Sequence, residues 1–157
     1  MLLKRKLRSA MTLSTDDWAF FLHAFIFLGT ARLAILLLPF RWIASSLGAQ
    51  QQETASGGLS IQEKTIVRRV AVSIQRASRY TPWNSNCLAQ AITANRLLKQ
   101  HNVASTLYLG LTKPAHKPAL DKAHAWVRSG RFYVVGGNGA LNYCIVATFA
   151  TETVKSQ

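Results

Sequence analysis

Two short stretches decide how this chain folds: Trp-Asn-Ser-Asn-Cys-Leu-Ala-Gln-Ala at residues 83–91 and Ala-His-Ala-Trp-Val at residues 123–127. In the first, Cys87 follows helix-capping residues and opens a predicted helix. In the second, His124 lies at the start of a predicted strand. A thiol and an imidazole placed in this way can meet in space although they are far apart in sequence. Because the chain has only 2 cysteines, we interpret Cys87 and His124 as a candidate nucleophile and base.

The sequence around Cys87 favours a helix with one packed face. Ser85 or Asn86 is a good N-cap, and apolar residues then recur at helical spacing to about His101. Cys87 falls on the apolar stripe at the start of this helix, where free backbone amides stabilise a thiolate. The alternative is that Cys87 is only a small buried apolar residue.

The second half of the chain predicts an antiparallel sheet. Residues 103–111 are rich in β-formers. Residues 123–128 and 131–135 flank Ser-Gly at 129–130, which is typical of a hairpin with a short turn. Residues 141–149 supply a final strand. With helices leading and strands following, the predicted class is α+β.

These residues together resemble a known family. Cys-Leu-x-x-Ala at 87–91, a strand, Ala-His-Ala-Trp-Val at 123–127 and a Gly hairpin look like the transglutaminase-like leader peptidases of lasso peptide biosynthesis. The apolar run at 30–41 is similar to the helical lead-in of their stand-alone form, and the resemblance covers residues 24–149. It implies a papain-like/transglutaminase-like cysteine peptidase core with an N-terminal helical lead-in and a C-terminal antiparallel sheet. It also implies a Cys-His protease that removes the leader from a ribosomally made precursor peptide.

The resemblance further implies partners. The precursor would be presented by a separate leader-binding protein, and the released core peptide would pass to an ATP-dependent, asparagine-synthetase-like lasso cyclase. No segment of the chain resembles a leader-binding domain, which fits the split form of the system. No cofactor is expected.

The third member of the site departs from the family pattern. The family usually carries an Asp at the end of the second hairpin strand, but residues 134–138 hold no carboxylate. Asn138 is the expected substitute, since an amide oxygen can accept the second imidazole N–H of His124. Failing that, a backbone carbonyl of Gly136 or Gly137 is expected to face the imidazole, because the hairpin returns the chain towards His124. The competing interpretation is that residues 136–139 form only a flexible turn. Asp121, in the loop before His124, is the only acid close by in sequence.

The oxyanion of an acyl-transfer intermediate needs donors near the nucleophile. The Cys87 backbone N–H at the helix end is one candidate. A side chain from the preceding loop, Trp83 or Asn84, is the second.

Composition limits the partners. The chain has 157 residues, of which 49% are hydrophobic, enough for one domain with a core. Its formal net charge is +13, which is typical of proteins that meet nucleic acid, an anionic membrane or an acidic peptide. The sequence shows no helix-turn-helix, zinc-finger or basic–aromatic RNA-binding pattern, which argues against nucleic acid.

The cysteine and histidine content points to a reducing compartment and no metal. With Cys87 assigned to catalysis, a disulfide framework is not expected, and a cytoplasmic protein fits. Cys144, in an apolar run, is interpreted as a buried strand residue. No His/Cys spacing resembles a zinc site. His101 falls at a predicted helix end, where a cation suits the dipole.

The N-terminal third is organised as a helical lead-in at 1–48, a polar linker at 49–59 and then the peptidase core at 60–157. Residues 19–40 are long and apolar enough to span a membrane, which takes ~20 residues. Arg32 within them is costly in lipid, so we favour a helix packed on the domain or on a partner over membrane association. A capping box opens a basic helix at 60–79, either a solvated face or a docking surface for an acidic partner.

Two other functions use the same residues. One is acyl transfer of the transglutaminase or arylamine-acetyltransferase type, with the same Cys-His dyad. The other is a catalytically weak, basic, membrane-associated adaptor, which the missing Asp allows.

Overall fold

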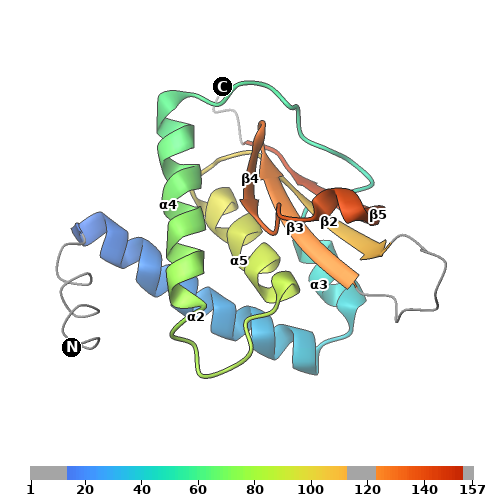
Figure 1. The fold of residues 1–157 in the computed structure, drawn as a ribbon, viewed down its shortest axis with the longest axis horizontal. Coiled ribbons are helices and arrows are strands. Elements are labelled where there is room, and N and C mark those ends of the chain that lie inside the picture. The colour runs from blue at the N-terminus through green and yellow to red at the C-terminus, as the bar shows by residue number, and fades with distance from the viewer. Residues whose placement is uncertain (1–13, 113–122, 154–157) are drawn as a thin grey trace.

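The computed structural model describes residues 14–112 and 123–153, in which helices pack on one face of an antiparallel sheet (Figure 1). The helices are α2 (Thr15–Leu37), α3 (Phe40–Ser46), α4 (Ile61–Ala77) and α5 (Cys87–Gln100). The strands are β1 (Ala49–Gln50), β2 (Ser105–Thr112), β3 (Ala123–Ser129), β4 (Phe132–Val135) and β5 (Tyr143–Thr151), with a short 3-10 helix η1 (Ala140–Asn142) before β5. The predicted α+β class is confirmed.

Side-chain caps set where the helices begin. Ser14 accepts a hydrogen bond from the Asp17 backbone N–H and starts α2. Ser60 and Glu63 form a reciprocal capping box that starts α4. Pro39 separates α2 from α3, since proline has no N–H to continue a helix.

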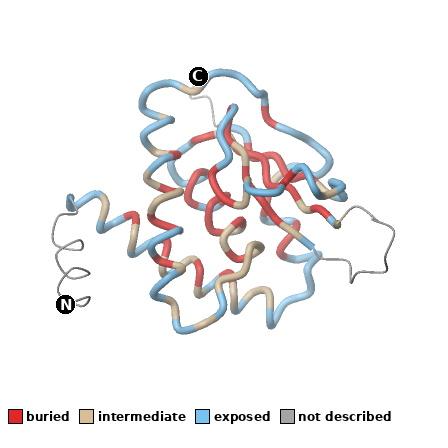
Figure 2. Tube along the Cα trace, viewed as in Figure 1, coloured by how far each residue is buried: buried red, intermediate tan, exposed pale blue. Residues whose placement is uncertain are grey.

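The sheet has the order β1-β5-β2-β3-β4, and every pairing is antiparallel. Alternate residues of β3 point to opposite faces. Ala125 and Val127 belong to the main core with the helices, whereas Trp126 joins Tyr108 and Ala140 in a small cluster on the other face. Figure 2 shows the buried residues concentrated between the helices and the sheet.

The polar stretch 49–59, which the sequence suggested was a linker, is held against the sheet. Its first residues form β1 against β5. The Thr54 backbone N–H donates to Thr106 Oγ1 at 2.9 Å, and Glu53 accepts from the Tyr108 hydroxyl at 2.8 Å. Arg128 also donates to Glu53, at 3.3 Å. Residues 49–59 are thus ordered by side-chain contacts, which composition alone does not reveal.

The lead-in helix α2 shares the core of the rest of the protein. It packs against α4 and α5 through Phe20, Ala24, Leu28 and Ala31. Arg69 of α4 also pairs with Asp16 at 3.4 Å and Asp17 at 3.6 Å. Within the described residues, α2 is the one helix long and apolar enough to cross a membrane.

Cys144 corrects one expectation. It lies in a strand, as predicted, but its side chain is exposed rather than buried. The first half of β5 is largely exposed and the second half is buried, so the apolar run around Cys144 does not mark the core. An apolar run cannot by itself tell how far the helices cover a strand.

Candidate functional site

Cys87 is the first residue of α5. Asn86 is the N-cap, and its Oδ1 accepts from the Ala89 backbone N–H at 3.0 Å. The thiol is half-buried and packs against the main core. As the first helical residue, Cys87 has a backbone N–H without an intrahelical acceptor. The predicted helix opening is therefore confirmed, and the thiol lies at the positive end of a helix.

The loop before Cys87 is fixed by its own hydrogen bonds. The hydroxyls of Thr81 and Ser85 lie 2.8 Å apart, and Thr81 Oγ1 also donates to the Trp83 carbonyl at 3.2 Å. Gln90, one turn into α5, donates to the Ser85 carbonyl at 2.8 Å. These bonds join the loop to the helix and set the position of Cys87.

His124 is the second residue of β3, and its ring has a defined acceptor. Its Nε2 lies 2.8 Å from the carbonyl oxygen of Gly136. Because a carbonyl only accepts, Nε2 carries the proton, and in the neutral ring Nδ1 is left as the free base. The ring also stacks on Tyr143, with centroids 4.8 Å apart, and on Trp126, with centroids 5.7 Å apart.

Glycines make this arrangement possible. Gly136 has a φ of +71°, and a Cβ there would lie 2.5 Å from the Ala125 carbonyl oxygen. Gly110 pairs with His124 across the sheet, and a Cβ on it would lie 2.9 Å from both the Trp126 ring and Tyr143 Cβ. Both contacts would force the backbone or the rings beside the imidazole to move.

The structure brings together the elements that carry the two residues. Helix α5 packs on β3, and Figure 1 shows the start of α5 and the start of β3 at the same end of the molecule. The His124 ring, however, lies with Trp126 on the face away from the main core, into which Cys87 packs. In the described part of the chain no hydrogen bond joins the thiol to the imidazole.

The other predicted site residues lie as follows. Trp83 packs on α2, against Phe25 and close to Gly29, and its buried indole Nε1 has no hydrogen-bond partner. Asn84 and Asn138 are exposed, and the imidazole is bonded to the Gly136 carbonyl rather than to the Asn138 amide. Asp121 lies outside the described residues. Whether Asn138, Trp83 or Asn84 acts in catalysis stays a prediction.

Sequence reasoning missed two neighbours of the imidazole, Tyr143 and Gly110. Tyr143 begins a strand that is distant in sequence, and only the pairing of β2 with both β3 and β5 brings it to His124. A glycine inside an otherwise β-forming stretch was the available signal, since it often marks a close approach or a bulge. The β2–β5 register does shift between Leu109 and Gly110.

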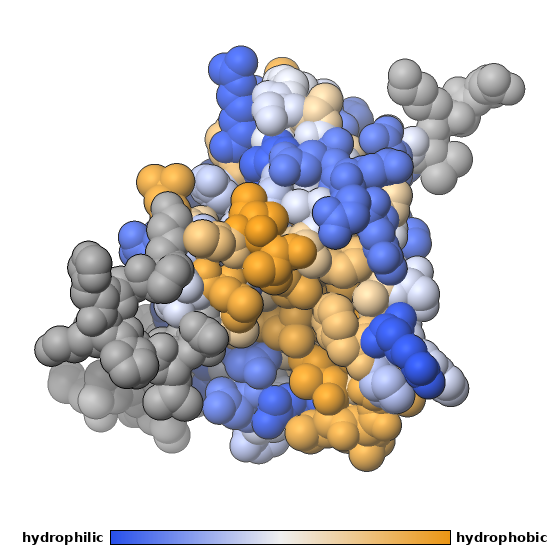
Figure 3. Space-filling view, turned by 90° about the vertical axis from the view of Figure 1, so that its right-hand side faces the viewer, coloured by the Kyte–Doolittle hydropathy of each residue, from blue (hydrophilic) through white to orange (hydrophobic). Residues whose placement is uncertain are grey.

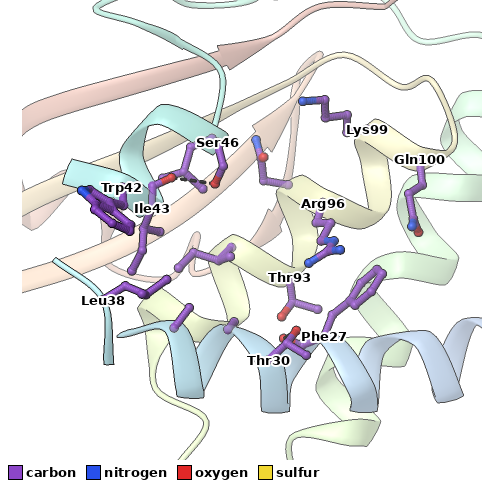
Figure 4. A pocket seen from close by; sticks show the side chains of 15 residues that line it. Phe27, Thr30, Leu38, Trp42, Ile43, Ser46, Thr93, Arg96, Lys99 and Gln100 are labelled. Carbon is purple, nitrogen blue, oxygen red and sulfur yellow. Dashed lines mark hydrogen bonds between the residues drawn. The ribbon is translucent and has the colours of Figure 1, made fainter. Parts of the chain in front are cut away.

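A separate groove of about 610 Å³ lies between α2, α3 and α5 (Figure 4). Leu38 and Trp42 form an apolar wall on one side, and Arg96 and Lys99 of α5, with Phe27 of α2, line the other side. The Arg96 guanidinium sits over the Phe27 ring, 4.4 Å from its centroid. Because the groove follows the middle and end of α5, it is not part of the Cys87 site at the start of that helix.

Comparison with known proteins identifies one relationship. The family model described as "Transglutaminase-like superfamily" matches residues 34–147. The matched range contains both Cys87 and His124 and most of the chain. No curated protein and no solved structure matches.

Proposed function

Because the chain belongs to the transglutaminase-like superfamily, which includes cysteine peptidases and acyltransferases, we propose that it is a cysteine peptidase. Its substrate is the leader region of a ribosomally made lasso precursor peptide. The observation that supports this most is the imidazole of His124, whose Nε2 is bound to the Gly136 carbonyl at 2.8 Å and whose Nδ1 is left as a base. The helix that carries Cys87 packs directly on the strand that carries this imidazole.

The proposed reaction requires that substrate binding bring the His124 ring, which lies with Trp126 on the face away from the main core in this structure, within reach of Cys87. His124 Nδ1 then takes the thiol proton, and Cys87 Sγ attacks the scissile carbonyl carbon. The tetrahedral intermediate collapses to a thioester as the peptide C–N bond breaks, and the imidazolium returns the proton to the leaving amine. Water, deprotonated by the same nitrogen, then hydrolyses the thioester and restores the thiol. The Gly136 carbonyl keeps the ring in the required tautomer throughout, the role that Asp or Asn has in related sites.

Two donors are proposed for the oxyanion. The Cys87 backbone N–H is free of helical hydrogen bonds by its position. The Trp83 indole N–H is buried without a partner, which is an unusual state for a donor, and a substrate oxygen would satisfy it. Asn84 is exposed and remains a weaker candidate.

The basic surface supports partners with negative charge. Exposed cations on α4 are Lys64, Arg68 and Arg76, and Arg79 follows just after the helix; the chain as a whole carries +13. We propose that an acidic region of a separate leader-binding protein or of the precursor contacts this helix, before the core peptide passes to an ATP-dependent cyclase in the cytoplasm. Long-range attraction of this kind speeds association and weakens as salt is added.

The test is cleavage of a precursor peptide by the full-length protein with its leader-binding partner, followed by mass spectrometry. Cys87→Ala and His124→Ala should each lower the rate at least about a thousandfold while the protein stays folded, as circular dichroism would show. Cys144→Ala is the matched control, because it removes the exposed thiol and should keep full activity. Cleavage that survives Cys87→Ala in purified protein would exclude the thiol mechanism.

The same reaction distinguishes acyl transfer from hydrolysis. When a primary amine is added, a peptidase releases mainly the free acid, whereas an acyltransferase gives the amide. A wild-type protein that neither cleaves nor forms a trapped thioester would support a non-catalytic adaptor.

A further inference from the structure

Helix α2 has apolar residues on two opposite faces. Phe20, Ala24, Leu28 and Ala31 are buried against α4 and α5. The opposite face carries an exposed stripe at helical spacing, which we call the outer stripe: Leu22, Ile26, Leu33 and Leu37, from 47% to 74% exposed. A helix that is apolar all round is normally covered on all sides, so the outer stripe predicts a second covering surface.

The apolar surface continues beyond the end of α2. Leu38, Phe40 and Trp42 are exposed at the α2–α3 junction, and Trp18 is exposed at the other end of α2. Figure 3 views the side on which α2 ends and α3 lies, and shows apolar surface reaching the lower edge of the molecule. Aromatic side chains at both ends of an apolar stretch are typical of elements that lie at a membrane–water interface.

Beyond the first turn of α2, which holds Asp16 and Asp17, the charged side chains around this surface are all basic. The sequence has no acidic residue between Asp17 and Glu53, and none in α5. Arg32, Arg41, Arg96 and Lys99 lie on α2, α3 and α5, and the last two line the groove beside α2. A second copy of this chain would bring +13 against +13, so self-association through this surface is disfavoured. An anionic partner fits both the cations and the apolar stripe.

We propose that the outer stripe of α2, with the α2–α3 junction, docks on the surface of an anionic lipid bilayer. The helix lies in the plane of the membrane, with its leucines among the acyl chains and the nearby cations among the phosphate headgroups. It does not span the bilayer, because the opposite stripe is buried in the protein core. Inserting α2 across the membrane would expose the α4 and α5 side chains that now pack on it.

The groove gives the headgroup contact a defined place. It opens along α2 between the apolar walls of Leu38 and Trp42 and the cations Arg96 and Lys99 (Figure 4). The stacking of Arg96 on Phe27 holds this guanidinium in position. A lipid whose phosphate lies near these cations would have its acyl chains next to the apolar surface that includes Leu38 and Trp42. This docking is independent of the proposed peptidase reaction.

Vesicle flotation tests the proposal with the full-length protein. Binding to phosphatidylcholine vesicles that contain about a third phosphatidylglycerol should be strong at low salt and weaken at high salt, and binding to pure phosphatidylcholine should be much weaker. High salt with alkaline carbonate should release the protein, as expected for a surface-bound helix. Resistance to this extraction would overturn in-plane docking in favour of a span.

Substitutions separate the apolar and basic contributions. The triple variant Leu22→Gln, Leu33→Gln and Leu37→Gln should bind the anionic vesicles at least about tenfold more weakly. A matched control changes three exposed apolar residues elsewhere: Ile61→Gln, Phe132→Gln and Leu141→Gln, at positions 83%, 46% and 84% exposed. The control should bind like the wild type. Arg96→Gln with Lys99→Gln should reduce binding and flatten its salt dependence.

Three results would overturn the proposal. Equal loss in the triple variant and its control would mean that the apolar contribution is not specific to α2. Equal binding to neutral and anionic vesicles would remove the role of the cations. Vesicle binding that is absent in the wild type, with a soluble protein partner captured through the same leucines, would assign the surface to that protein instead.

Discussion

Helices α5 and α2 differ in how clearly their sequences determine which face is buried. In α5, Ala91, Ala94 and Leu98 are buried on one side, while Arg96 and Lys99 are exposed on the other. Only one orientation of α5 buries its apolar side, and this orientation fixes where Cys87, at the start of the helix, lies relative to the sheet. In α2 the buried and exposed faces are both apolar, so the sequence predicts a helix but not what covers each face.

The consequence is a division of roles. The amphipathic helix α5 holds a candidate nucleophile, which needs one fixed position relative to β3. The lead-in helix α2 completes the core with one face and leaves the other, also apolar, exposed.

The two faces of α2 should differ sharply in stability. Leu28 is fully buried and Leu33 is 57% exposed. Leu28→Ala should lower the free energy of unfolding by about 2–5 kcal/mol, because it leaves a cavity between α2 and its neighbours. Leu33→Ala should change it by less than about 0.5 kcal/mol in the absence of lipid. Urea unfolding of both variants measures the difference, and similar losses would mean that α2 is covered on both faces in solution.

The turn that holds the imidazole should be sensitive to a single methyl group. Gly136→Ala meets both a positive φ and a contact of 2.5 Å with the Ala125 carbonyl oxygen, so it should cost about 1–3 kcal/mol. Activity should fall further than stability explains, since the Gly136 carbonyl moves away from His124 Nε2. Gly58→Ala is the control, because a Cβ there meets nothing within 4 Å. Full activity in folded Gly136→Ala would remove the carbonyl from the mechanism.

The fold was largely predictable because local signals agree with one another. The capping residues before α2, α4 and α5, and the hairpin turn between β3 and β4, act within a few residues and can be identified in sequence. Contacts made across the sheet could not be found in this way. The contacts of residues 49–59 with the sheet depend on which strands become neighbours. The exposure of Cys144 depends on how far along β5 the helices pack.

The candidate site was predictable in part. Cys87 and His124 were identified as candidates because each lies where an element was predicted to begin, and whether they act together stays a prediction. The hairpin indicated that the strand-end backbone could reach the imidazole, and the Gly136 carbonyl does so. Which oxygen would bind the ring depended on the positive φ of Gly136, a property of the turn rather than of a motif. Tyr143 comes to the ring only through long-range pairing of β2 with β5.

Asn138 should matter less than the Gly136 carbonyl. Asn138 is exposed, and the imidazole already has its acceptor at 2.8 Å. Asn138→Ala should therefore lower kcat by less than about tenfold, far below the effect of either dyad substitution. Asn138→Asp should preserve or raise kcat, because a carboxylate near the ring stabilises the imidazolium. Steady-state cleavage rates test both variants, and a loss in Asn138→Ala as large as that in His124→Ala would show that the amide is the true third member.

The smallest expected effect lies where α5 meets α2. His101, the C-cap of α5, stacks on Phe20 of α2 with ring centroids 4.6 Å apart. Burial, and then the nearby charge of His23, lower the pKa of His101 below its usual 6.5. The sequence predicted that a protonated His101 would be stabilised by the negative end of the α5 dipole. Burial and the charge of His23 outweigh that stabilisation.

A lowered pKa gives this contact a defined pH dependence. The unfolded chain binds a proton at His101 more readily than the folded protein, so the stabilisation is present above pH 6.5 and is lost as pH falls through the folded pKa. His101→Gln should therefore flatten the decline of unfolding free energy between neutral and acidic pH, and His23→Gln should flatten it less. Urea midpoints across that range, compared between the wild type and both variants, measure the effect. Parallel profiles would mean that the two helices meet at His101 without favouring its neutral form.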